Sequence, residues 1–339
     1  APAGGVELLR VPESGRVADG AGILGEEAVA RLNAILAHLE ASRAQASTWE
    51  IGEAQFDPAV QNRQETLFTI GNGYLGARGS LEERYPQDLP ATLINGLYDG
   101  APIVHSELAN APDWLSLQLI IAGERFSLWQ GQVLAHERAL DMRAGILTRR
   151  VRWRSPQGNT VEVRSERWAS LADVHLCVLH LGVTALDFAG DLELRAEIDG
   201  TAENPGTLAP AEIGLRHWQT LGHGNPTPQS AVLHVRTRLS RLDLGVATHL
   251  AVQGVAEARY AGLDCTHAPG IVARFHLEQG ETAVANKLVS YRTSVEAADP
   301  VAAALGGLQE AVSQGYAALL RAHRALWGEL WRDCDVGIE

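Results

Sequence analysis

Short alternating or apolar runs dominate the middle of the chain, from about residue 48 to residue 298. LTRRVRWRS and TVEVRSERWASL flank the segment Pro156-Gln157-Gly158-Asn159, a pattern typical of a hairpin. Further runs of this kind are VHLCVLHLGV, LELRAEIDG, AVLHVRTRLS, LGVATHLAV, IVARFHLE and TAVANKLVSYRTS. Because no helical pattern separates them, these runs predict a mainly β fold, a large antiparallel β-sandwich.

Helical periodicity is confined to the two ends of the chain. Apolar residues recur at near-helical spacing over residues 24–43, and the 3.6-residue period returns after Pro300. The pattern therefore predicts a helical N-terminal extension over residues 1–47, a β-sandwich domain over residues 48–298 and a helical linker over residues 299–339.

The amino-acid composition limits which binding partners and which cellular compartments are expected. The chain has 339 residues, 46% of them hydrophobic, and its 28 Lys and Arg against 41 Asp and Glu give a net charge of -13. This charge repels phosphate backbones and anionic lipids, so neither nucleic acid nor a membrane is an expected partner. Cys177, Cys265 and Cys334 are odd in number and far apart, which favours a reducing, cytoplasmic location. No stretch has the length of a membrane span, and the first residues lack signal-peptide features.

Glycines cluster at Gly71-x-Gly73-x-x-Gly76, the spacing of a dinucleotide-binding fingerprint. Such a site needs a crossover helix, but another glycine and the prolines Pro86 and Pro90 follow too soon for one to form. The glycines are therefore predicted to permit positive φ angles and close backbone approach in a bend between strands. A nucleotide-dependent oxidoreductase stays open as an alternative.

Several ordered motifs carry a family resemblance. WEIGEAQFDP, RQETLFTIGNGYLGARGSLEE, TLINGLYDG, ELANAPDW, HWQ and RAHRALWGELWRDCDVGIE occur in this order from about residue 48 to the last residue. Together they resemble the amino-terminal domain of glycoside hydrolase family 65, which contains inverting phosphorylases of maltose, trehalose and kojibiose and related α-glucoside hydrolases.

The resemblance implies a two-part parent enzyme, in which a sandwich and linker helices precede a catalytic (α/α)₆ barrel. Because the sequence ends where that barrel should begin, the resemblance places no catalytic residue in this chain, and the chain alone is expected to be inactive. The parent would convert an α-linked disaccharide and inorganic phosphate into β-glucose 1-phosphate and a free sugar, with the phosphate bound outside this chain. The resemblance implies that the enzyme needs no cofactor and that the full-length enzyme is a homodimer.

Two residues are candidates for substrate binding on this resemblance. In the family, an arginine and a threonine of this region bind the leaving-group sugar, and the matching positions are Arg78 in GARGS and Thr92 in ATLING. A guanidinium and a hydroxyl suit this task because both offer directional donors. The structural alternative is that Arg78, on a surface loop, pairs with Glu82 or Glu83 and that Thr92 satisfies a turn. Asn95 is expected in a turn with positive φ.

The remaining polar clusters favour structural roles. The adjacent acids Glu82 and Glu83, like Glu26 and Glu27, are predicted to be solvated pairs, because neighbours on a strand face opposite sides.

Histidines and tryptophans also favour packing. A core role is preferred for the group His175, Cys177 and His180, because His180 falls on the other strand face. His217 and His223 have no ligand-spaced partner, so no metal site is expected. Most of the eight tryptophans are expected to pack in the core. A stand-alone carbohydrate-binding or mutarotase-like sandwich remains the alternative function.

Overall fold

The computed structural model describes residues 49–100, 106–204 and 216–334. The chain divides into two compact units, residues 1–50 and 51–339. The helix predicted over residues 24–43 and the acids Glu26 and Glu27 lie outside the described residues. No helix in the described part of the chain is long and apolar enough to cross a membrane.

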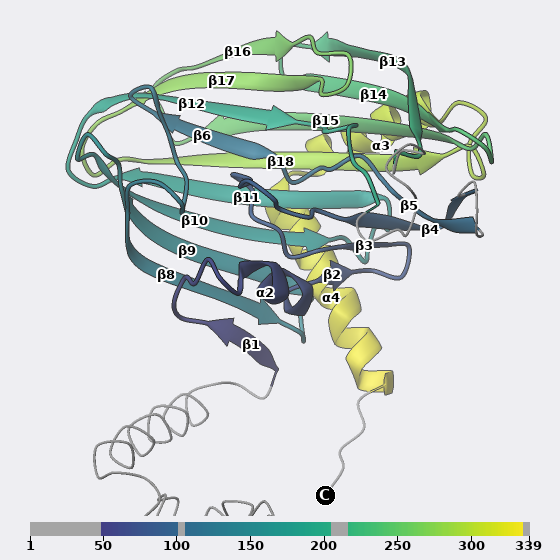
Figure 1. Cartoon of the computed structure of the whole chain (residues 1–339), viewed down its shortest axis with the longest axis horizontal. Helices are drawn as coiled ribbons and strands as arrows, with labels where there is room; N and C mark the ends of the chain where they lie inside the picture. The colour runs from purple at the N-terminus through teal and green to yellow at the C-terminus, as the bar shows by residue number, and fades with distance from the viewer. Residues whose placement is uncertain (1–48, 101–105, 205–215, 335–339) are drawn as a thin grey trace, which may run out of the picture. The chain divides into compact units, whose positions relative to one another are not determined.

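Within the described residues, nine antiparallel strands form the large sheet (Figure 1). Its order is β1 (Glu50–Glu53), β8 (Gln132–Asp141), β9 (Ile146–Arg154), β10 (Thr160–Ala169), β11 (Leu176–Ala185), β18 (Thr282–Thr293), β15 (Asp243–Gln253), β14 (Ser230–Thr237) and β13 (Trp218–Thr227). The predicted hairpin is β9 and β10, with Val161 opposite Trp153. Burial alternates along β9, so the period of two seen in the sequence reflects one face of the sheet turned inward.

Two smaller sheets, also antiparallel, are found in the described part of the chain. The five-stranded sheet has the order β16 (Ala258–Leu263), β17 (Gly270–Leu277), β12 (Gly190–Glu197), β6 (Leu117–Ile121) and β7 (Glu124–Arg125). The four-stranded sheet has the order β2 (Ile70–Gly71), β3 (Leu75–Ala77), β4 (Thr92–Gly100) and β5 (Ser106–Asn110). The short helix α2 (Gln61–Leu67), which the sequence pattern did not predict, precedes β2.

The main hydrophobic core fills the space between the sheets. β14 and β15 of the large sheet contact β17 of the five-stranded sheet, and β10 contacts β2 and β3 of the four-stranded sheet. Trp114 and Trp153 are fully buried in this core, where Phe126 meets Trp153 edge to face. Trp168 is buried in a second cluster on the other face of the large sheet, so the prediction that tryptophans pack is confirmed for these three.

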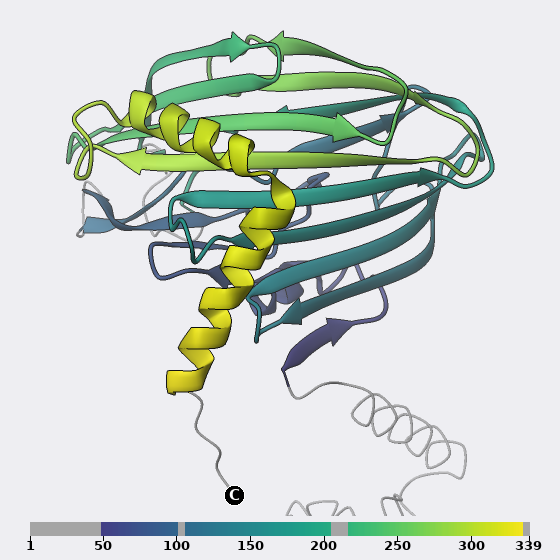
Figure 2. The same cartoon turned by 180° about the vertical axis from the view of Figure 1, so that it is seen from behind.

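Two helices cover the outer face of the large sheet (Figure 2). α3 (Pro300–Gln314) starts where Asp299 accepts a hydrogen bond from the Ala302 N–H at 2.9 Å, and it buries Ala304, Leu308 and Ala311 against the sheet. The sequence predicted one long helical segment, but Gly315, with φ 76°, separates α3 from α4 (Tyr316–Cys334). The predicted fold class, an antiparallel β-sandwich followed by helices, is confirmed.

His323 ties α4 to the sandwich. Its Nδ1 accepts from the Leu171 N–H at 3.1 Å, and its Nε2 lies 2.8 Å from the Ala144 carbonyl. Burial lowers the pKa of His323 to about 4, so the ring is neutral at pH 7. A neutral ring with the proton on Nε2 satisfies both contacts.

Candidate functional site

The glycine-rich segment forms a tight bend between two antiparallel strands. Gly71 lies opposite Gly76 in the β2–β3 hairpin, and Gly73 between them has φ 86°. At Gly79 a side chain would come within 2.6 Å of the Phe68 Cβ, so this position requires close backbone approach. The predicted bend is therefore confirmed. The described residues after β3 lead into the antiparallel strand β4 and not into a crossover helix.

Asn72 fixes this bend against the large sheet. Its Oδ1 accepts hydrogen bonds from the N–H groups of Tyr74 and Leu75, at 3.0 and 2.9 Å. Its Nδ2 donates to the carbonyl oxygens of Ser170 and Val174, at 2.7 and 2.8 Å. The loop is thus held at four points by one side chain, which pattern analysis of the sequence did not single out.

Arg78 follows β3 directly and points to helix α2. Its Nη2 donates to Asn62 Oδ1 at 2.8 Å, and its Nε lies 3.4 Å from Glu65 Oε2. Its side chain is 21% exposed, whereas that of Glu65 is fully buried. The structural alternative expected from the sequence was wrong in its partner, because the ion pair forms with Glu65 and not with Glu82 or Glu83.

The backbones of Thr92 and Arg78 are neighbours, but their side chains do not meet. Thr92 lies opposite Ala77 in the β3–β4 pair, and the Arg78 N–H donates to the carbonyl of Ala91 at 2.8 Å. Because successive residues face opposite sides of a sheet, Arg78 points away from the face that Thr92 shares with Ala77. Thr92 is 1% exposed, it lies in a strand instead of a turn, and its hydroxyl has no hydrogen-bond partner among the described residues.

Asn95 is also placed differently from the prediction. It lies within β4, where it is exposed, and the positive φ of 82° belongs to Gly96 alone. The pairing of β4 with β5 shifts register between Leu93 and Tyr98, so the Asn-Gly pair forms a bulge inside a strand instead of a turn.

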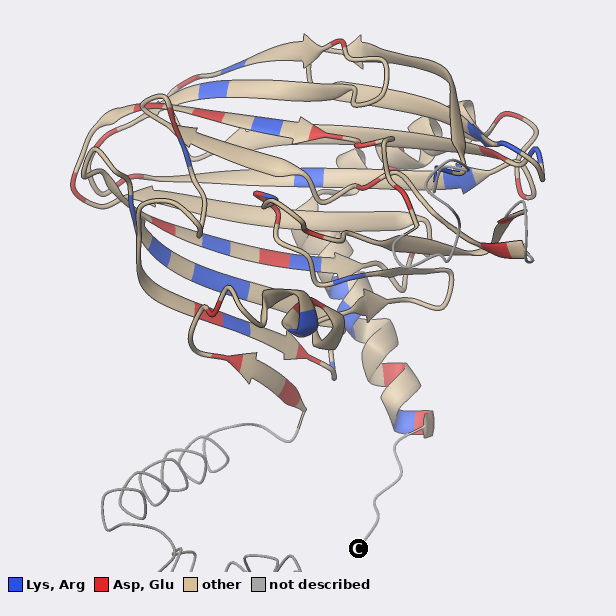
Figure 3. Cartoon of the chain, viewed as in Figure 1, with Lys and Arg blue, Asp and Glu red and all other residues tan. Residues whose placement is uncertain are grey.

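Glu82 and Glu83 are not solvated, so that prediction was wrong. Both are buried, and Arg149 Nη2 contacts Glu82 Oε2 at 2.9 Å and Glu83 Oε2 at 2.6 Å. Arg167 Nη1 donates to Glu82 Oε1 at 3.1 Å. The two acids lie in an irregular segment after β3, where the alternation expected of a strand does not apply, and the buried Arg149 of β9 and Arg167 of β10 are their charge partners. Figure 3 shows that Lys and Arg positions recur along β8, β9 and β10 of the large sheet.

These groups belong to a larger set of buried charges, which we call the buried charge layer: Glu53, Glu65, Glu82, Glu83, Arg138, Arg149 and Arg167. Burial opposes the ionisation of Glu82, but the charges of Arg149 and Arg167 outweigh it and lower its pKa to about 2. Glu53 is paired with Arg138 at 2.7 Å. A carboxylate held ionised in this way is a poor proton donor at neutral pH.

The imidazole of His136 lies beside this layer without joining it. Burial first, and then the charges of Arg149 and Arg138, lower the pKa of His136 to about 3. Its ring is therefore neutral at pH 7, and it packs 5.8 Å from the ring of Phe56. The buried charge layer thus contains paired ions and has the character of a structural element.

His175 and His180 have side-chain partners, and Cys177 lies in the main hydrophobic core. His175 packs on Tyr74 with ring centroids 4.4 Å apart, and His180 contacts Asn286 at 2.8 Å. Cys177 is fully buried, and burial raises its pKa.

His217 lies between Asp99 and Glu107, with contacts of 3.0 and 2.8 Å, and His223 contacts Asp264 at 3.0 Å. The sequence pattern did not reveal these two acids as partners of His217, because 118 and 110 residues separate them from it. Among the described residues, no group of three or more His, Cys, Asp or Glu side chains is arranged to hold a metal ion.

A shallow depression of about 270 Å³ adjoins the bend. It is lined by residues of the β2–β3 turn and of β4, with Leu108 from β5. Leu93 and Tyr98 on β4 are 39% and 46% exposed, so the four-stranded sheet presents apolar surface to solvent beside the loop that carries Arg78. Exposed apolar surface of this kind marks a candidate contact area.

Comparison with known proteins gives a consistent result. Glycosyl hydrolase family 65, N-terminal domain, matches residues 51–330. The chain is 29% identical over 311 residues to the α,α-trehalose phosphorylase of Thermoanaerobacter brockii, covering 86% of this chain and 40% of that protein. It is 28% identical to the kojibiose phosphorylase of Halothermothrix orenii, covering 86% of this chain and 38% of that protein.

A solved structure assigned as a kojibiose phosphorylase from human microbiome has the same fold. It superposes with a TM-score of 0.70 at 18% identity, covering 85% of this chain and 38% of that one. The chain therefore spans about 40% of the length of the relatives it matches.

Proposed function

The chain belongs to glycosyl hydrolase family 65, whose N-terminal domain it contains, and on that premise we propose that it is the sandwich portion of an α-glucoside disaccharide phosphorylase or hydrolase. In this proposal the sandwich shapes the substrate entrance of a catalytic barrel outside this chain. Inorganic phosphate is the co-substrate in the phosphorolytic case. The assembled enzyme is a homodimer and cytoplasmic.

The observation that carries this proposal is the match of residues 51–330 to an N-terminal domain. Relatives with a named activity include a trehalose phosphorylase and a kojibiose phosphorylase, which are more than twice the length of the matched region. Glu53, Glu82 and Glu83 are buried and paired with arginines within the sandwich. This pairing supports a proposal in which the sandwich has a structural role and the catalytic acid belongs to the barrel.

Within the entrance, we propose that Arg78 contacts the leaving-group sugar. Its Nε and Nη2 are engaged by Glu65 and Asn62, which leaves Nη1 without a partner among the described residues. The guanidinium is thus held in one orientation with a donor to spare, a favourable arrangement for recognising a sugar hydroxyl. Thr92 is buried, so for this residue we propose a supporting role behind the loop.

The test is the replacement Arg78→Ala in the full-length parent enzyme. Loss of a charge-assisted hydrogen bond is expected to lower kcat/KM for the disaccharide about ten- to a hundredfold, corresponding to roughly 1.5–3 kcal/mol. In the synthetic direction, KM for the acceptor sugar should rise while KM for the sugar phosphate stays unchanged.

Arg150→Ala is the matched control, because Arg150 is an exposed arginine on β9. Since truncating Arg78 also removes the partner of buried Glu65, melting temperatures must accompany the kinetics. Unchanged kinetics of a folded Arg78→Ala enzyme on every accepted disaccharide would contradict the recognition role. Tight binding of glucose or maltose by the isolated chain would instead favour a stand-alone carbohydrate-binding sandwich.

A further inference from the structure

A row of charged residues crosses the outer face of the five-stranded sheet. Arg259 on β16 lies directly opposite Arg274 on β17, and Arg274 lies opposite Glu193 on β12. Glu193 lies opposite Ile120 on β6, which in turn lies opposite Arg125 on β7. Residues directly opposite each other in antiparallel strands share a face, so one row contains three arginines and one carboxylate.

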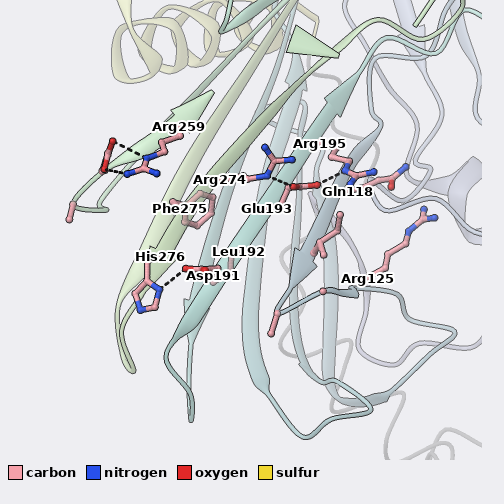
Figure 4. Close-up of a pocket in the computed structure, with 15 residues that line it drawn as sticks. Gln118, Arg125, Asp191, Leu192, Glu193, Arg195, Arg259, Arg274, Phe275 and His276 are labelled. Carbon is pink, nitrogen blue, oxygen red and sulfur yellow. Dashed lines mark hydrogen bonds and ion pairs between the residues drawn. The ribbon is translucent and has the colours of Figure 1, made fainter. Parts of the chain in front are cut away.

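This row lines a hollow of about 1080 Å³ (Figure 4). Arg195 on β12 also lines it, so the lining contains four arginines against the acids Asp191, Glu193 and Glu257. Arg125, at the β7 end of the row, donates to the carbonyl of Glu83. The hollow is rich in arginine although the chain as a whole has a net charge of -13. Its volume lies just above the range of about 300–1,000 Å³ that is typical of pockets for small organic molecules, so it has room for one.

The arginines of the hollow keep donors unused. Figure 4 shows Glu193 between Arg274 and Arg195. Among the described residues, the Glu193 carboxylate accepts only from the Nε atoms of these two arginines, at 2.6 and 2.5 Å. The Nη nitrogens of both side chains have no partner among the described residues. Two guanidinium groups thus share one carboxylate, and each still presents its Nη atoms.

Arg259 and Arg274 lie directly opposite each other, an arrangement that favours binding of an anion between them. Like charges directly opposite in a sheet are destabilising, and Arg259 is 79% exposed while Arg274 is 61% exposed. Among the described residues, Arg259 pairs only with Glu257, which directly precedes β16, at 3.1 and 3.2 Å. An anion bound between the two guanidinium groups would remove this repulsion and use the free donors.

A second arginine cluster shows what a satisfied arrangement looks like. On the outer face of the large sheet, Arg150 and Arg164 direct both Nε and Nη2 to Glu162, with contacts of 2.6 to 3.1 Å. Arg152 adds a third contact at 3.2 Å. There the carboxylate engages the fork of each of the two guanidinium groups, whereas Glu193 engages one nitrogen of each.

We propose that the hollow on the five-stranded sheet binds a phosphate group between Arg259 and Arg274, with the Nη atoms of Arg274 and the remaining Nη1 of Arg259 as donors. A phosphate fits because its oxygens accept from several guanidinium forks at once and its charge matches the surplus of arginines. Gln118 lines the same hollow and can hydrogen-bond a hydroxyl group of a phosphorylated small molecule, whereas the His276 Nδ1 is engaged by Asp191 at 2.8 Å. This site is separate from the entrance loop and does not depend on the proposed enzyme function.

The test is isothermal titration of the full chain with inorganic phosphate, glucose 6-phosphate and glucose. Saturable binding of glucose 6-phosphate, of inorganic phosphate or of both, with no binding of glucose, is the expected result, and the tighter ligand identifies the source of the phosphate. The double replacement Arg259→Gln and Arg274→Gln should weaken binding at least about tenfold, because two charge-assisted hydrogen-bond donors are lost.

The matched control is the double replacement Arg150→Gln and Arg164→Gln, which changes the net charge equally on the other sheet. It should leave affinity within about twofold, since a general charge effect would act on both pairs alike. Equal weakening by the two double variants would overturn the proposal. So would the absence of saturable binding by both phosphate compounds, or binding of unphosphorylated glucose that matches glucose 6-phosphate.

Discussion

Arginine and glutamate side chains meet both in the buried charge layer and on the outer face of the five-stranded sheet. In the layer, Arg149 and its partners Glu82 and Glu83 have side chains at most 5% exposed. On the sheet face, the side chain of Arg274 is 61% exposed while its partner Glu193 is 15% exposed. The same residue types therefore perform different tasks. Water compensates a lost partner on the surface, whereas in the interior only another side chain can do so.

The replacement Arg149→Met tests the difference between buried and exposed arginines most strongly. The replacement leaves Glu82 with Arg167 alone and Glu83 without its arginine, so unfolding free energy should fall by about 3–5 kcal/mol. Urea denaturation of the purified chain measures this loss. Arg152→Met, which removes a 45% exposed arginine from the same strand, should cost at most about 1 kcal/mol. Similar losses in the two variants would show that burial does not distinguish them.

Acidification should act on the buried layer. The folded pKa of Glu82 is about 2, below its ordinary value of 4.5, so its contribution to stability is complete above pH 4.5 and is lost as pH falls toward 2. The loss should be on the order of 3 kcal/mol at complete protonation, of which about 2 kcal/mol is lost by pH 3. Urea denaturation at pH 7, 4 and 3 measures it, with Glu82→Gln as the reference variant. A Glu82→Gln protein whose stability falls as steeply below pH 4.5 would count against this assignment.

The smallest effect is expected from Arg274→Gln. Its partner Glu193 keeps Arg195, and the group that is removed is largely exposed, so unfolding free energy should change by less than about 1 kcal/mol. Thermal and urea unfolding without added phosphate measure the change. A loss comparable to that of Arg149→Met would erase the difference between the two regions.

Much of the sandwich could be predicted from the sequence because burial on one face of a strand leaves a period of two. The β9–β10 hairpin and the strand β18 are examples, and so is the positive φ at Gly73. The same rule failed for Glu82 and Glu83, since an irregular segment can bury two neighbours at once. Their partner Arg149 occupies an inward position of β9 between apolar residues, and its charge hides that position from a hydrophobicity pattern.

The candidate site was less accessible to prediction. Arg78 and Thr92 could be chosen by family motifs, but their surroundings depend on contacts between distant parts of the chain. The break at Gly315 was missed because glycine is tolerated within a helical pattern, and only the backbone conformation shows that α3 ends there. Helix α2 was missed because seven residues are too few to establish a period.

The segment from Ser170 to Val174 is a mechanical coupling within the sandwich. From one side Asn72 holds the carbonyl oxygens of Ser170 and Val174, and from the other side His323 of α4 holds the N–H of Leu171. A pull on α4 is therefore transmitted through these few peptide units to the glycine bend, and the stiffness of the bend becomes a property shared with a helix on the opposite face of the large sheet.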